Sequence, residues 1–244
     1  MASKAHDYTV AVPGGITPEI RLGTSSGSVT VFAEPRAGIV IIASHPAAKP
    51  PAVAPGGTLD LSSLFRPSTT ITLRCPVGSD LLVGTASGTV RCQGTIGRLR
   101  VTTASGSVFV EDARVVEART VSGSIEAGRV SDLARVHTRS GSIQIGSAAI
   151  ADLATVSGRI IVGSVEADIR VHTASGRVTM STSGRADVRT RTISGQVTVI
   201  LPPGTRPDAR LKSMRGRTSC NCEPGQDCRI ICQSVSGKIE VVTA

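Results

Sequence analysis

Aromatic side chains are scarce in this chain. Its 244 residues include no Trp, one Tyr and three Phe, which together make 2% of the sequence. Globular domains commonly fill part of their interior with these bulky rings. Hydrophobic residues still make up 40%, so a core must be built from Val, Ile, Leu, Ala and Thr. Such side chains suit a narrow, evenly stacked interior.

Long apolar runs are also missing. No stretch approaches the roughly 18 consecutive apolar residues that a membrane-spanning helix requires. The N-terminal residues lack the apolar region of a secretory signal peptide. We therefore expect a chain without a membrane span that is located in the cytoplasm.

What the sequence does contain is a repeat. Ser-Gly, one further residue and then Val or Ile recur along the chain, and from Ser87 to Ser194 the intervals are 17, 18 or 19 residues. Apolar residues lie three and five residues after each Ser, and four and six residues before it, with Thr190 as the exception. Alternation with a period of two indicates strands with one buried face. The residue two positions before the Ser is always Thr or Ser.

Each repeat is therefore interpreted as a strand, a tight Ser-Gly corner, a second strand and a looser turn. We expect a sharp turn at the glycine, often with a positive φ. The expected corner glycines are Gly88, Gly106, Gly123, Gly141, Gly158, Gly176, Gly195 and Gly237. The preceding Thr residues are expected to stack in a ladder, with their hydroxyls bonded to the backbone.

Stacking of such units predicts an all-β fold, a single-chain parallel β-helix, or β-solenoid. A coil would take about 17–18 residues, and the chain would form roughly ten coils. Prolines interrupt the pattern early, and they remove donors from a strand ladder. We expect an N-terminal β region at residues 1–68 with a Pro-rich excursion at 45–57. The solenoid repeat domain would then span 69–244, with a Cys-containing C-terminal coil.

Two runs carry a resemblance to a known family. They are Cys75-Pro-Val-Gly-Ser-Asp-Leu-Leu-Val-Gly-Thr-Ala-Ser-Gly-Thr-Val and Val101-Thr-Thr-Ala-Ser-Gly-Ser-Val. They resemble the bacterial adhesin-like domain family of unknown function, whose members have repeated Ser-Gly coils. The resemblance covers most of residues 8–244. It implies a β-solenoid fold and little about activity.

The cysteines are the first candidate site. Cys75 and Cys92 are one coil apart at inward positions, so we expect them to stack as neighbours in the core, as buried thiols or as a disulfide. A C-terminal set consists of Cys220, Cys222, Cys228 and Cys232. It allows three interpretations: a thiolate metal site, a disulfide between the second and third members, or reduced structural cysteines. The spacing is not that of a common zinc ribbon.

Basic residues are the second candidate site, because the formal net charge is +9. They recur at the outward positions five and three residues before the corner Ser. The expected face consists of Arg100, Arg119, Arg135, Arg170, Arg189, Arg191, Arg210 and Lys212. Such a face attracts polyanions and acidic proteins. Glu117 and Asp152 interrupt it, and no aromatic residues interleave for base stacking.

No residue pattern indicates catalysis. Every corner carries the same Ser, so none is set apart as a nucleophile, and no Gly-Lys-Ser/Thr loop is present to bind phosphate. We therefore expect a non-enzymatic structural or interaction protein without a cofactor or small-molecule substrate. It would act through its outer face or by end-to-end self-association, since the sequence stops within the strand-like run that begins at Ile239. The alternatives are a binding module for a polyanion or an acidic protein, and a polysaccharide-acting β-helix enzyme.

Overall fold

A computed structural model describes residues 5–13 and 16–243, and within these ranges the chain forms strands and no helix. Most strands pair in parallel, which confirms an all-β fold of the β-solenoid kind. The coil length and the count of roughly ten coils stay predictions. No helix in these ranges is long and apolar enough to cross a membrane. The chain divides into two compact units, Met1–Ser124 and Ile125–Ala244, which are described separately.

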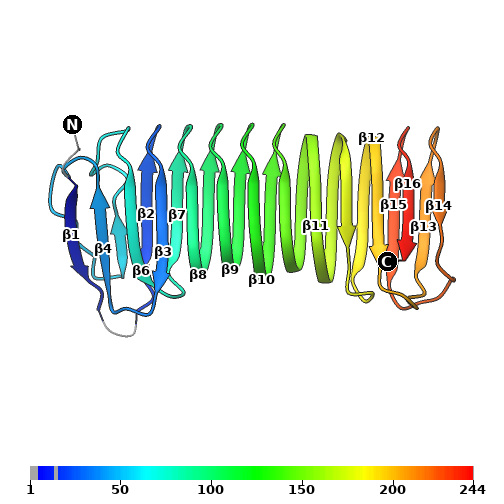
Figure 1. The fold of residues 1–244 in the computed structure, drawn as a ribbon, viewed down its shortest axis with the longest axis horizontal. Coiled ribbons are helices and arrows are strands. Elements are labelled where there is room, and N and C mark those ends of the chain that lie inside the picture. Colours follow the sequence, from blue (N-terminus) through cyan, green and yellow to red (C-terminus); the bar gives the residue numbers. More distant parts are fainter. Residues whose placement is uncertain (1–4, 14–15, 244) are drawn as a thin grey trace. The chain divides into compact units, whose positions relative to one another are not determined.

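The first unit has two walls of strands, seen at the blue to green end of Figure 1. The post-corner wall has the order β1-β4-β6-β3 and then the first halves of β8 and β9. The pre-corner wall has the order β5-β2-β7 and then the second halves of the same long strands. The strands are β1 (His6–Ala11), β2 (Glu19–Thr24), β3 (Val29–Glu34), β4 (Gly38–Ala43), β5 (Thr58–Asp60), β6 (Ile71–Pro76), β7 (Asp80–Thr85), β8 (Val90–Thr103) and β9 (Val108–Thr120).

The start of the first unit departs from the parallel pattern. β4 pairs antiparallel with both β1 and β6. Tyr8 of β1 makes an edge-to-face contact with Phe65, with ring centroids 6.2 Å apart, and Leu59 and Leu61 are fully buried nearby in the sequence. Tyr8 and Phe65 therefore pack together where regular stacking begins, whereas the rings of Phe32 and Phe109 lie under the guanidinium groups of Arg74 and Arg91. β2 and β3 already pair in parallel with β7 and β8, so the corner at Gly27 belongs to the same stack as later corners.

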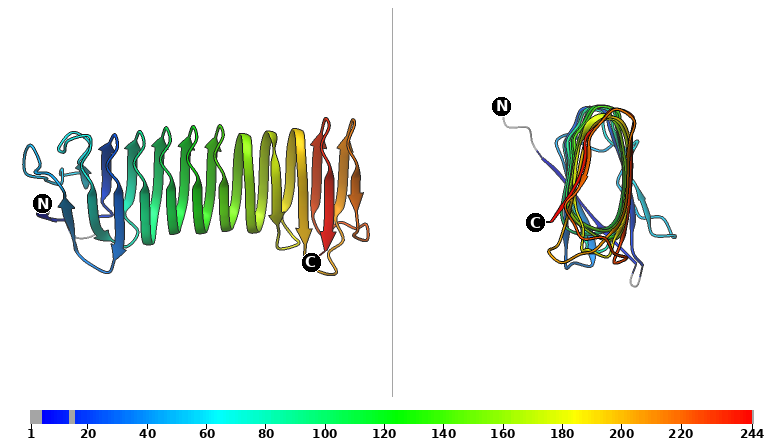
Figure 2. Two further views of the ribbon diagram at one scale, coloured as in Figure 1. Left: turned by 45° about the horizontal axis from the view of Figure 1, so that its top comes forward. Right: turned by 90° about the vertical axis from the view of Figure 1, so that its right-hand side faces the viewer.

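The second unit repeats the two-wall arrangement, and its coils appear in Figure 2 as long walls joined by narrow turns. The pre-corner wall has the order β10-β11-β12-β15-β13. The post-corner wall places β16 between β12 and β14. The strands are β10 (Ile125–Thr138), β11 (Ile143–Ser181), β12 (Asp187–Leu201), β13 (Asp208–Ser213), β14 (Thr218–Cys220), β15 (Arg229–Ser234) and β16 (Ile239–Thr243).

The order of coils in space differs from their order in sequence at the end of the second unit. After β12 the chain passes on to β13 and β14, then returns to lay β15 and β16 into the intervening positions (Figure 1). Ile239 of β16 is paired with Val197 on one side and Thr218 on the other. The expectation that this last strand forms an exposed, uncapped end is therefore wrong. End-to-end self-association stays a prediction, without that strand as its basis.

The edge coil of the second unit, β13 and β14, is the degenerate copy of the repeat. Its inward positions include Ser213, Thr218 and Cys220, where the neighbouring coil has Ser234, Ile239 and Val241. The first three side chains are exposed or half-buried, whereas the latter three are buried. Polar residues suit the outer face of a terminal repeat, because no further coil covers them. The repeat pattern weakens here because this coil is a cap.

Corner glycines are required by close stacking. No described corner glycine has a positive φ; the positive values occur at Gly57, Gly78, Gly94, Gly184 and Gly204. The expectation of a positive φ at the corners is therefore wrong. Instead, a Cβ placed on a corner glycine would come under 3.0 Å from a backbone carbonyl oxygen of the neighbouring coil, closer than real Cβ atoms come. This holds for Gly88, Gly106, Gly123, Gly158, Gly176, Gly195, Gly216 and Gly237.

The Thr residues before the corners are buried, as expected, and many of them bind the backbone. Thr103 Oγ1 accepts a hydrogen bond from the Gly106 N–H at 2.9 Å, and the same bond recurs at Thr85, Thr120 and Thr138. The three corners within β11 and β12 differ, because their strands continue through the turn. There the buried hydroxyls of Thr155, Thr173 and Thr192 have no hydrogen-bond partner.

Replacing a corner glycine by Ala should destabilise the first unit. In Gly88→Ala the new methyl group would collide with the Gly27 carbonyl oxygen, so backbone must shift at a cost of roughly 1–3 kcal/mol or more. Gly84→Ala is the matched control, because its Cβ would meet the nearest atom at 4.0 Å. Thermal unfolding followed by circular dichroism should show a lower midpoint for the first variant only. Equal midpoints for the two variants would contradict the stacking explanation.

The two kinds of Thr should respond differently to loss of the hydroxyl. Thr103→Val leaves the Gly106 N–H without its acceptor, which should cost about 1–3 kcal/mol. Thr173→Val removes a buried hydroxyl that has no partner, so stability should be unchanged or slightly higher. Denaturant titration of both variants measures the difference, and a larger loss at Thr173 would refute this account.

Candidate functional site

The cysteines of the first unit are buried but are not neighbours on adjacent strands. β3 lies between β6 and β8, with Ala33 opposite Cys75 and Val31 opposite Cys92. The expectation that the two thiols stack directly is wrong, because β3 enters the stack between the strands that carry them. Burial raises the pKa of the Cys75 thiol to about 11 and that of Cys92 to about 12. Both are free thiols that act as small hydrophobic core residues.

The four C-terminal cysteines are only partly brought together. Cys232 is fully buried in β15, where burial raises its pKa to about 12. Cys220 is exposed on the cap coil and Cys222 lies against it; burial and this neighbouring thiol raise the pKa of Cys222. Cys228 lies near Cys222, and burial raises the pKa of Cys228 to about 11. All four are free. Within residues 5–13 and 16–243 no group of three or more His, Cys, Asp or Glu side chains could hold a metal ion.

The repeated corner serines make backbone contacts. Ser87 Oγ donates to the Ser25 carbonyl oxygen at 3.3 Å, and Ser105 Oγ donates to the Ala86 carbonyl oxygen at 3.4 Å. Ser236 makes the equivalent bond in the second unit. These bonds join one corner to the next, which is a structural role that repeats from coil to coil.

The arginines five residues before the corner Ser form a row that carboxylates neutralise, called here the paired row. The outward side chains reach acidic residues on the same strand or on the next one. The nitrogen–oxygen distances are Arg100–Glu117 2.9 Å, Arg135–Asp152 3.2 Å, Arg170–Asp168 2.8 Å, Arg189–Asp168 3.6 Å, Arg189–Asp187 3.8 Å and Arg210–Asp208 3.5 Å. Exposed pairs such as these add little stability. Their effect is to offset the positive charge of this row.

The basic residues three positions before the corner form a different row, called here the open row. In the second unit the residues at this position on β11, β12, β15 and β13 are His172, Arg191, the uncharged Gln233 and Lys212, which are opposite one another. Neither Arg191 nor Lys212 forms an ion pair with a carboxylate of the described residues. Arg119, at the same position in the first unit, lies opposite Thr102 and likewise has no such ion pair. The expected basic face is thus divided into a neutralised row and an uncompensated one.

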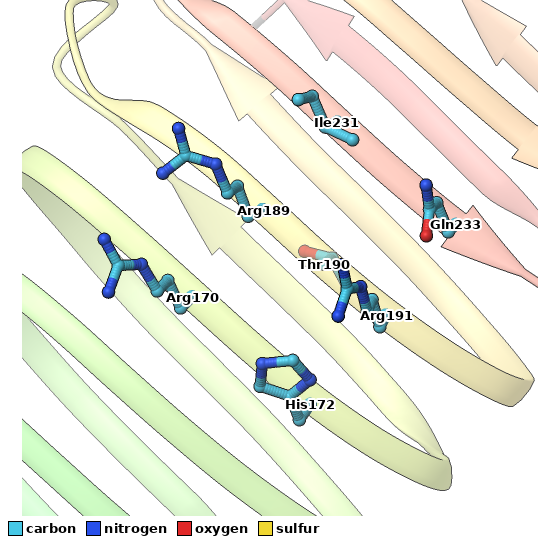
Figure 3. Close-up of a pocket in the computed structure, with 7 residues that line it drawn as sticks. All are labelled: Arg170, His172, Arg189, Thr190, Arg191, Ile231 and Gln233. Atoms are coloured by element: carbon cyan, nitrogen blue, oxygen red, sulfur yellow. The ribbon is translucent and has the colours of Figure 1, made fainter.

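A shallow groove lies over these rows in the second unit. It has a volume of about 360 Å³. Figure 3 shows its outward side chains on three neighbouring strands, namely Arg170, His172, Arg189, Arg191, Ile231 and Gln233. β15 contributes shorter side chains here than the arginines of β12 and the Arg210 and Lys212 of β13 that flank it. The groove forms because the returning strand β15, which carries Ile231 and Gln233 at the outward positions, lies between the basic residues of β12 and β13.

A row of exposed aliphatic residues was not anticipated from the sequence. It occupies the position directly before the corner Ser, or before Arg215 in the cap coil, and is called here the aliphatic row. In the second unit its members are Val156, Ala174, Ile193, Val235 and Met214. Val156, Ile193 and Met214 are 51%, 59% and 75% exposed. The sequence feature that could have revealed this row is the residue directly before the corner Ser, which changes from Ser or Ala in early repeats to mostly larger aliphatic residues in late ones.

Thiol reactivity should follow burial. Alkylation of the native protein at mildly alkaline pH should modify exposed Cys220 and half-buried Cys222, and reach Cys92 and Cys232 only after denaturation. Because folding raises the pKa of the buried thiols, their contribution to stability is complete below the unfolded value near 9.0 and is lost as pH rises toward about 12. Mass spectrometry of the labelled peptides measures the order. Rapid native labelling of Cys92 would contradict the assignment of this thiol to the core.

Comparison with known proteins places the chain in a family. No curated protein matches it. Two solved structures named as candidate adhesins are similar to this chain. The structure from Bacteroides fragilis NCTC 9343 has 14% sequence identity and a TM-score of 0.41, with 98% of each chain covered. The structure from Parabacteroides merdae ATCC 43184 has 9% sequence identity and a TM-score of 0.42, with 100% of this chain and 97% of that chain covered. These identities and TM-scores are too low to carry an argument about function. The family model described as Toastrack DUF4097 matches residues 3–241, in agreement with the resemblance to an adhesin-like domain family of unknown function. The chain belongs to the Toastrack DUF4097 family.

Proposed function

We propose that this protein is a non-enzymatic scaffold that binds an anionic partner through the outer face of its second unit. The observation that carries the proposal is the open row. Arg191 of β12 and Lys212 of β13 lie on either side of the uncharged Gln233 of β15, and neither has a carboxylate partner among the described residues. They lie beside a row in which every arginine is paired. Charge left uncompensated on an exposed face is available to an external anion.

The solenoid framework supports this role because it holds the cations in fixed positions. The inward residues of the same strands, such as Val171, Cys232 and Ile230, are fully buried. Outward side chains on neighbouring strands are then spaced by about 4.8 Å. A rigid array of this kind binds without the entropic cost of ordering a loop.

Features of the site disfavour two other functions. Binding of single-stranded nucleic acid commonly uses aromatic platforms, and the groove is lined by Arg, His, Thr, Ile and Gln. Catalysis would need a side chain set apart from the repeat. The serine hydroxyls donate to backbone carbonyls in the same way at several corners.

Binding to a soluble polyanion should depend on the open row. We expect Arg191→Gln combined with Lys212→Gln to weaken binding of a fluorescent heparin oligosaccharide. The slope of log affinity against log salt should become shallower by ~1 for each lost cation. Fluorescence anisotropy over a range of salt concentrations measures both quantities.

Arg100→Gln provides the matched control, because Glu117 already neutralises this arginine in the first unit. It should leave both affinity and salt slope close to those of the parent chain. The proposal fails if binding is absent, if it is independent of salt, or if the control variant loses as much affinity as the open-row variant.

A further inference from the structure

The aliphatic row of the second unit lies on successive strands and so forms a continuous patch. In spatial order it runs through Val156, Ala174, Ile193, Val235 and Met214. Singly exposed aliphatic residues are normal on protein surfaces. A contiguous exposed row beside charged residues instead marks an interaction surface. A second hollow, of about 340 Å³, connects this row with His172 and Arg191 of the open row.

Cations flank the aliphatic row on both sides. We define a corner segment as the six residues from three before the corner Ser to two after it, or the equivalent residues of the cap coil. In the second unit these segments are 137–142, 154–159, 172–177, 191–196, 212–217 and 233–238. They contain no Asp or Glu and the following basic residues: Arg139, Arg159, Arg177, Arg191, Lys212, Arg215, Arg217 and Lys238.

Among the described residues, most of these cations form no ion pair with a carboxylate. Lys238 forms an ion pair with Glu240, which lies just outside its segment. The arginines at positions 159, 177 and 217 lie on the far side of the corner from the open row, are exposed, and form no ion pair with a carboxylate of the described residues. The turn of the second unit therefore presents aliphatic side chains in the middle and positive charge along both margins.

The first unit lacks this combination. Its corner segments are 23–28, 84–89, 102–107 and 119–124, and they contain Arg119 as their single cation and no carboxylate. The residues before the corner Ser are Ser25, Ala86, Ala104 and Val121. The same backbone corner therefore tolerates small and neutral residues. The aliphatic and basic residues of the second unit are not required by the fold.

We propose that the corner edge of the second unit docks on an anionic lipid bilayer, with its aliphatic row entering the interface and the flanking cations contacting the headgroups. This inference rests on the proposed function, because it names the anionic partner. Near an anionic membrane each Lys or Arg strengthens binding by roughly fivefold. Aliphatic side chains add binding by leaving water. A soluble polyanion would use the cations and leave the aliphatic row in water.

The edge also has a form that suits a bilayer. Narrow turns join the two walls of the unit (Figure 2). The aliphatic residues directly precede these corners in the sequence, and Val156, Ile193 and Met214 are exposed to solvent. A soft, deformable layer of lipid can surround a projecting edge. A folded protein partner would need a complementary cleft, and a polyanion offers no apolar surface to the row.

The test uses the full chain and vesicles of phosphatidylcholine, with and without about 30% phosphatidylglycerol. Co-sedimentation should show binding to the anionic vesicles and little to the neutral ones. Ile193→Ala combined with Met214→Ala should reduce vesicle binding several-fold while leaving heparin binding unchanged. Arg177→Ser combined with Arg191→Thr should weaken both vesicle binding and heparin binding, because two cations are lost. The fold should tolerate these substitutions, because residues of these types occur at the same positions in the first unit.

The matched control is Val121→Ala, which removes an aliphatic side chain at the same corner position in the first unit. It should leave vesicle binding unchanged. Because the chain contains no Trp, Ile193→Trp gives a fluorescent reporter at one site. Its emission should shift to shorter wavelength with anionic vesicles, whereas Val121→Trp should show no shift.

The outcomes separate the two proposals. If heparin binds but anionic vesicles do not, or if Ile193→Ala with Met214→Ala binds vesicles like the parent chain, the lipid inference is overturned and the proposed function stands. If neither heparin nor vesicles bind, both fail. If the parent chain sediments as a dimer that the same aliphatic substitutions dissociate, and vesicles are not bound, the row is an interface between copies and the lipid inference is overturned.

Discussion

Close stacking of backbone at the Ser-Gly corner is the constraint on which each unit depends. Successive corners approach so closely that a carbonyl oxygen of one coil occupies the place where a side-chain carbon of the next would lie. Glycine is required for this reason, and the Ser and Thr hydroxyls beside it bind backbone atoms of the turn. With the corners held at strand spacing, the inward Val, Ile and Leu columns pack in register. A core of this width has little need of aromatic rings, and among the described residues only Tyr8 and Phe65 form a ring contact, where regular stacking begins.

The same constraint separates structural from functional positions. Inward residues and corner glycines are repeated because every coil must match its neighbours. Outward residues meet no such demand, so they can differ from coil to coil. The paired row is neutralised by Glu117, Asp152, Asp168 and Asp208, while the open row and the corner edge of the second unit are not. The two kinds of surface differ in the positions of their carboxylates, since both contain arginines.

Stacks of repeats also need ends, and the second unit achieves one by changing the order of its coils. The degenerate coil at β13 and β14 takes the outer place, and the final repeat fills the gap inside it. Because the outer coil is covered on one side only, Thr218 and Cys220 can replace aliphatic residues there. The return of the chain also puts Ile231 and Gln233 between basic residues, which produces the groove.

Much of the fold could be predicted from the sequence. Alternation with a period of two around a recurrent Ser-Gly determines which residues face inward, and this local pattern is enough to establish a stacked parallel β fold. The positions of the basic residues on one outward face could be predicted for the same reason. The carboxylates that pair with these arginines could not be predicted. Arg170 and Asp168, for example, form an ion pair through side-chain placement that periodicity does not describe. Nor could the sequence show that β3 separates Cys75 from Cys92, or that β16 lies between β12 and β14. Both features depend on which strands are neighbours, and in a repetitive sequence many pairs of strands fit nearly equally well. The sequence by itself thus determined the coil and its corner; only the tertiary structure decided the order of coils, the cap, and which cations remain free to bind.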